Sequence, residues 1–148
     1  MHPFFKHILA AAALGASLLA PLAASAQSAD ASLYQHLGEK PGIERLMNDF
    51  VTRLAADART GPFFAKANLP HLKEQLTDQV CQVSGGPCEY GGADMKTAHA
   101  DMDIRKGDFN ALVEVLEQAM DAQGIAFADQ RQLLARLAPM HRDVITVR

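Results

Sequence analysis

Clusters of basic residues are missing from this sequence of 148 residues. Lys and Arg together number 14, Asp and Glu number 17, and no segment gathers a block of Lys and Arg. Nucleic-acid binding needs such a patch, because basic side chains must neutralise the phosphates. The composition therefore predicts that nucleic acid is not a partner.

Familiar catalytic motifs are also missing. The chain has no glycine-rich phosphate loop, no Gly-x-Ser-x-Gly elbow and no His-Glu-x-x-His pair, and its histidines are scattered singly. It has two cysteines, Cys81 and Cys88, which are few for a metal cage. These absences exclude most hydrolase and nucleotide-binding functions.

The N-terminal segment differs in composition from the rest of the chain. Residues 8–23 are apolar or small and carry no charge, Lys6 precedes them, and Ala24-Ser25-Ala26 fits a small-x-small cleavage site. We expect residues 1–26 to be a signal peptide, 27–32 a linker and 33–148 the folded domain, so that the mature protein is periplasmic or secreted. The alternative is a membrane anchor, but a span needs about 20 apolar residues and this run is shorter. No stable membrane span is expected after cleavage.

Export would place the two cysteines in an oxidising compartment. Cys81 and Cys88 would reach a compartment in which disulfides persist, so we predict a bridge between them. The alternative is two unpaired thiols, because a separation of seven residues does not guarantee the geometry that a disulfide requires.

Apolar residues recur at helical spacing along most of the remaining chain. We expect helices over residues 42–57 and 70–83, a short helix that Asp94 caps, a helix with an apolar face from Phe109 to Met120 that stops at Gly124, and a last helix over 128–141. No segment alternates strictly between apolar and polar residues, as a half-buried strand would. The predicted fold class is all-α.

Several short patterns follow one another in a specific order. They are Leu33-Tyr34-x-x-Leu37-Gly38, Gly42-Ile43, Asp49-Phe50, Pro62-Phe63-Phe64, Leu72-Lys73, Gly85-Gly86-Pro87, Tyr90, Met95-Lys96-Thr97-Ala98-His99 and Ile104. Across residues 33–143 this order resembles the group I truncated haemoglobins.

The resemblance implies a shortened globin fold, in which helices packed two over two enclose haem. His99 matches the family's proximal iron ligand, which makes it the expected metal ligand, and Phe64 matches the phenylalanine that packs on the haem face. The other expected cofactor-binding residues are Phe50, Leu72, Leu76, Met95, Ile104 and Lys73, the last as a partner for a haem propionate. Because no Cys-x-x-Cys-His motif is present, we expect non-covalent haem b.

The distal side departs from the family pattern. Many members place a tyrosine in the first long helix and a glutamine in the second, and these side chains hydrogen-bond bound oxygen. The matching positions here are Val51 and Leu76, with Leu72 one turn before the latter. An apolar distal pocket predicts faster oxygen loss and easier oxidation, unless Gln75 or Gln79 supplies a donor.

The expected function is reversible binding of dioxygen, nitric oxide or carbon monoxide at a haem iron held by one histidine. Nitric oxide dioxygenation, which would need a reductase, and peroxidase-like activity stay open as enzymatic roles. An alternative is a periplasmic Cu(I) protein, because Met95, His99 and Met102 share one helical face and supply soft ligands. A third possibility is a disulfide-braced helical interaction module without a cofactor.

Overall fold

The computed structural model describes residues 33–147. The expected signal peptide (1–26) and linker (27–32) lie outside the described residues. Throughout 33–147 every regular element is helical, which confirms the predicted all-α class. No helix in that part of the chain is long and apolar enough to cross a membrane.

The helices follow the expected order. They are α2 (Glu39–Ala56), α3 (Gly61–Phe64), α4 (Leu69–Val83), α5 (Met95–Ala98), α6 (Lys106–Ala122), α7 (Phe127–Leu137), the 3-10 turn η1 (Ala138–Met140) and α8 (His141–Val144). The single last helix expected over 128–141 is wrong, because the α-helix ends at Leu137. Pro139 lies in η1 and has no backbone N–H to continue the α-helical ladder. The chain therefore bends into η1 before α8.

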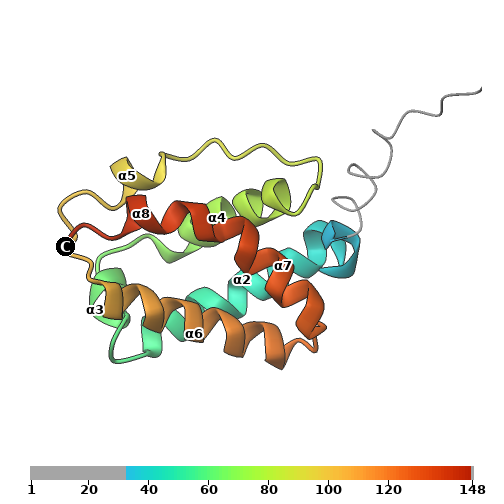
Figure 1. The fold of residues 1–148 in the computed structure, drawn as a ribbon, viewed down its shortest axis with the longest axis horizontal. Helices are drawn as coiled ribbons and strands as arrows, with labels where there is room; N and C mark the ends of the chain where they lie inside the picture. The colour runs from blue at the N-terminus through green and yellow to red at the C-terminus, as the bar shows by residue number, and fades with distance from the viewer. Residues whose placement is uncertain (1–32, 148) are drawn as a thin grey trace, which may run out of the picture.

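Helix α2 lies at the centre of the packing. It packs against both α4 and α6, and α4 also contacts α7 (Figure 1). The core combines residues of α2, α6 and α7, including Ile43, Leu46, Met47, Leu54, Val115, Met120 and Leu133. Full burial of each large aliphatic side chain contributes roughly 1.5 to 3 kcal/mol. This arrangement agrees with the expected two-over-two packing.

The turn before α2 contains an unusual conformation. Gly38 has φ 80° and Glu39 has φ 56°, so a residue with a side chain occupies the left-handed region beside the glycine. The left-handed conformation costs a non-glycine residue roughly 1 to 2 kcal/mol, yet α2 still begins there.

A disulfide joins the end of α4 to the loop that follows it. Cys81 and Cys88 are bonded, with their Cα atoms 5.7 Å apart. Gly86 lies inside this small ring, where a Cβ would come within 2.7 Å of the Cys81 Sγ and 2.6 Å of the Tyr34 ring. In the chain-entropy account, closing a loop this short stabilises the fold by roughly 2 to 3 kcal/mol. The loop that leads to α5 is thus tied to α4.

Candidate functional site

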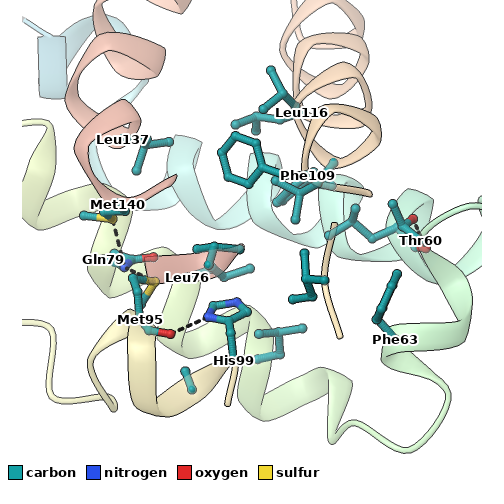
Figure 2. Close-up of a pocket in the computed structure, with 18 of the residues that line it drawn as sticks. Thr60, Phe63, Leu76, Gln79, Met95, His99, Phe109, Leu116, Leu137 and Met140 are labelled. Carbon is teal, nitrogen blue, oxygen red and sulfur yellow. Dashed lines mark hydrogen bonds between the residues drawn. The ribbon is translucent and has the colours of Figure 1, made fainter. Parts of the chain in front are cut away.

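A cavity of about 560 Å³ lies among the helices. Its size falls in the range of sites that enclose small molecules and cofactors. Residues of α2, α3, α4, α5, α6 and the C-terminal helices all contribute to its walls (Figure 2). Most of these side chains are apolar, among them Met47, Phe50, Leu54, Phe63, Phe64, Leu72, Leu76, Ile104, Phe109, Leu112 and Leu116.

His99 is the histidine that lines this cavity. It directly follows α5, and its Nδ1 lies 2.7 Å from the backbone carbonyl oxygen of Met95, one helical turn earlier (Figure 2). A carbonyl can only accept, so Nδ1 carries the proton and donates it. Nε2, on the other side of the ring, is then the nitrogen left to bind a metal, which is the arrangement of a metal-ligating histidine whose orientation a backbone acceptor sets.

The short helix that carries His99 is capped at its first turn. The Asp94 carboxylate accepts from the Thr97 backbone N–H at 3.0 Å and from the Thr97 hydroxyl at 2.7 Å. These hydrogen bonds lower the pKa of Asp94. Since a four-residue helix is marginal by itself, the cap helps to hold the backbone that presents His99.

The other histidines of the described region do not line the cavity. His36 Nδ1 pairs with Asp129 Oδ1 at 2.9 Å, and the His71 side chain is 64% exposed. His141 packs edge-on against Phe109, with 5.4 Å between the ring centroids. Within residues 33–147, His99 is therefore the one histidine available to a group bound in the cavity.

Polar groups gather at one part of the wall. Tyr90 lines the cavity and its hydroxyl donates to the Ala93 carbonyl at 2.7 Å, while burial, and secondarily the charge of Asp94, raises the pKa of Tyr90. The nearby Gln75 Oε1 is buried without a hydrogen-bond partner, and a Cβ on Gly92 would lie 2.5 Å from it. A buried, unpaired amide oxygen is costly, and only a group that donates a hydrogen bond could satisfy it.

Most of the residues predicted for the site do line the cavity. They are Phe50, Phe64, Leu72, Gln75, Leu76, Gln79, Met95, His99 and Ile104. The whole site is built from residues 47–144 of this chain. The structure thus brings residues from both long predicted helices to one place.

Two predicted residues lie elsewhere. Val51 is fully buried but does not line the cavity, which α2 faces with Met47, Phe50 and Leu54. Successive residues of a helix are rotated by about 100°, so the position after Phe50 points away, and a short valine does not reach back. Lys73 also lies off the cavity wall, and its Nζ is 3.5 Å from the Thr52 hydroxyl oxygen. Val51 is therefore not part of the cavity wall, where it was expected, and the pairing of Lys73 with a haem propionate stays a prediction.

The side-chain amide of Gln79, considered above as a donor to bound oxygen, has other hydrogen-bond partners. Its Nε2 donates to the Met95 Sδ at 3.6 Å and to the Met140 Sδ at 3.7 Å (Figure 2). Sequence reasoning missed Met140, because it precedes α8 far along the chain. It also missed Met47, although the helical spacing between Met47 and Phe50 was a usable signal.

The cavity residues fit haem. An apolar pocket of several hundred Å³ suits the macrocycle, and a single imidazole suits the iron. His99 would hold the iron, and Phe50, Phe64, Leu72 and Leu76 would pack on the ring. Fold and site together define a haem protein of the shortened globin class.

The chain belongs to the bacterial-like globin family, whose sequence profile matches residues 32–146. The group 1 truncated haemoglobin of Nostoc sp. (strain MUN 8820) is 29% identical over 109 residues, which cover 74% of this chain and 92% of that protein. The one from Mycolicibacterium paratuberculosis is 28% identical over 116 residues, covering 78% and 85%. The chain is thus a globin with haem as its cofactor, as the resemblance implied.

Solved structures agree with this assignment. The truncated haemoglobin of Tetrahymena pyriformis in its Fe(III) form has a TM-score of 0.73 and 26% identity, covering 76% of this chain and 97% of that one. The group II truncated haemoglobin of Bacillus anthracis, at 22% identity and a TM-score of 0.69, shows the same fold. These relatives are all haemoglobins, so the comparisons favour haem and offer no support for the Cu(I) alternative.

Proposed function

We propose that this protein reversibly binds dioxygen, or another diatomic gas, at a haem iron that His99 holds. The observation that carries this proposal is the orientation of His99, whose Nδ1 is bonded to the Met95 carbonyl while the ring lines the cavity. When bound, haem would supply an iron that can coordinate a gas. The chain's own residues line the cavity and set its polarity.

Three apolar residues of the cavity wall are proposed to govern how long the gas stays bound. Phe50 of α2 and Leu72 and Leu76 of α4 line the cavity with apolar side chains, and none of them can donate a hydrogen bond to the gas. We propose that dioxygen therefore leaves faster than it would with a polar pair in these places. Nitric oxide dioxygenation would in addition require an electron donor, such as a reductase.

Titration of the purified chain with hemin tests the proposal. We expect saturation at one hemin per chain with a Soret band, and, after reduction, a five-coordinate spectrum that changes on addition of carbon monoxide. The physical reason is that the cavity supplies one imidazole and no second histidine among the described residues. Absorption spectroscopy of the ferric, ferrous and carbonyl forms is the measurement. Hemin uptake that never saturates would contradict the proposal.

We also propose that the protein is exported, as the composition of residues 1–26 predicts. A mature protein that begins at Gln27 is expected in the periplasmic fraction or the medium, and intact mass spectrometry of that fraction measures it. A variant with Ala24→Glu and Ala26→Glu is the matched control, because bulky charged residues should block cleavage. Full-length protein confined to the cytoplasm of the parent strain would overturn this proposal.

A further inference from the structure

Gln79 connects three elements around the cavity. It lies on α4 and is only 7% exposed, and its side-chain amide donates to the sulfur of Met95 on α5 and to the sulfur of Met140 in η1. Figure 2 shows the amide between the two thioethers. A residue of one long wall of the cavity thereby holds both the short helix α5 and the turn before α8.

The chemistry of these contacts makes them sensitive to geometry. A thioether sulfur is a weak hydrogen-bond acceptor, whereas burying an amide without a partner is costly. The Gln79 amide has two weak acceptors, so it is best satisfied when Met95 and Met140 are both close. Movement of α5 away from α4 would lengthen one of these contacts and leave the amide N–H groups underpaired.

The same methionine continues the connection to His99. While the Met95 side chain accepts from Gln79, its backbone carbonyl accepts from the His99 Nδ1 at 2.7 Å. Helix α5 is only four residues long and follows a loop, so it has little regular structure of its own to fix this carbonyl. Gln79 therefore supplies a tertiary restraint where local structure is weak.

We propose that Gln79 is a positioning residue for the iron ligand: through Met95 it sets the place and orientation of the His99 imidazole. This inference rests on the proposed function, in which His99 holds the iron. Gln79 does not touch the iron ligand itself, and its amide is committed to the two sulfurs rather than to a gas in the cavity. Outer contacts of this kind change metal affinity by about 10- to 100-fold.

The variant Gln79→Met tests the proposal, because methionine has a similar length and shape but no donor. We expect hemin to dissociate about 10-fold faster and the iron–histidine stretching band of the ferrous protein to shift. In the haem-free protein, hydrogen exchange of the backbone amides of residues 98–102 should accelerate. Hemin transfer to an excess of apomyoglobin, resonance Raman spectroscopy and exchange mass spectrometry are the measurements.

A second variant and a control sharpen the result. Met95→Leu removes the sulfur but keeps the carbonyl, so it should shift the same band in the same direction, and combining it with Gln79→Met should add little. Gln118→Met places the same change on an exposed position of α6 and should have no effect. If Gln79→Met fails to fold, the shift of the iron–histidine band in Met95→Leu tests the positioning role instead.

Failure of this inference is distinguishable from failure of the proposed function. An iron–histidine band and a hemin-loss rate that stay at the parent values in Gln79→Met would overturn the positioning role while leaving His99 as the ligand. A parent protein with no iron–histidine band would instead refute the proposed function. The exchange measurement on the haem-free chain would then still report whether Gln79 restrains α5, and unchanged exchange would overturn that restraint.

Discussion

Replacing His99 with glycine is expected to lower the hemin affinity of this protein by about 100-fold or more, because removing a ligand should cost at least as much as removing its outer contacts. A 100-fold loss corresponds to about 2.8 kcal/mol. No other histidine among the described residues lines the cavity, so none can take its place without a rearrangement. Hemin titration followed by absorption of the ferrous form measures the effect.

The His99→Gly variant also permits a rescue. Added imidazole should enter the space left by the side chain and restore a histidine-like spectrum, because it replaces the donor without its backbone tether. His71→Gly is the matched control, since that side chain is mostly exposed and lies off the cavity wall. An unchanged affinity and spectrum in His99→Gly would rule out His99 as the iron ligand.

Replacing Leu76 with glutamine is expected to slow dioxygen dissociation by about 10- to 100-fold, because a hydrogen bond to a charged acceptor contributes roughly 1.5 to 3 kcal/mol. Dioxygen gains partial negative charge in a haem site, and an amide N–H can donate to it. Leu76 lines the cavity from α4. Rapid mixing or flash photolysis of the ferrous protein measures the rate.

Leu76→Met separates polarity from packing in this experiment. Methionine is apolar and fills a similar volume, so the dissociation rate should stay near the parent value. Val51 would be the wrong position for the same test, since it does not line the cavity. Should Leu76→Gln and the parent release dioxygen at the same rate, the apolar wall would not be what sets ligand lifetime.

The elements with a strong local signal were predictable from the sequence. Helices α2 and α4 carry apolar residues every three or four positions, and this spacing fixes which face is buried before any neighbour is known. The cap at Asp94 and the stop at Gly124, which has φ 68°, follow from properties of single residues. Pro139 carried an equally local signal, and its effect on the last helix was overlooked.

Some residues of the candidate site were likewise predictable from the sequence, and others were not. His99, Phe64, Leu72 and Leu76 were predictable because the order of short patterns resembles a family with a known cofactor. Which residue of α2 faces the cavity could not be predicted from the pattern alone. Phe50 and Val51 are adjacent in sequence but rotated by about 100° around the helix, and only Phe50 reaches the cavity. A pattern places a residue in a helix more securely than it places the tip of its side chain.

By itself the sequence determined the all-helical class, the order of the helices, the family and the histidine that we propose as the iron ligand, because these depend on local periodicity and on the order of motifs. Only the tertiary structure decided that Gln79 meets Met95, 16 residues away, and Met140, 61 residues away. The same is true of the corner formed by Gln75 and Tyr90. Such contacts depend on how helices distant in sequence pack together, and helical periodicity reports the buried face but not the partner that it meets.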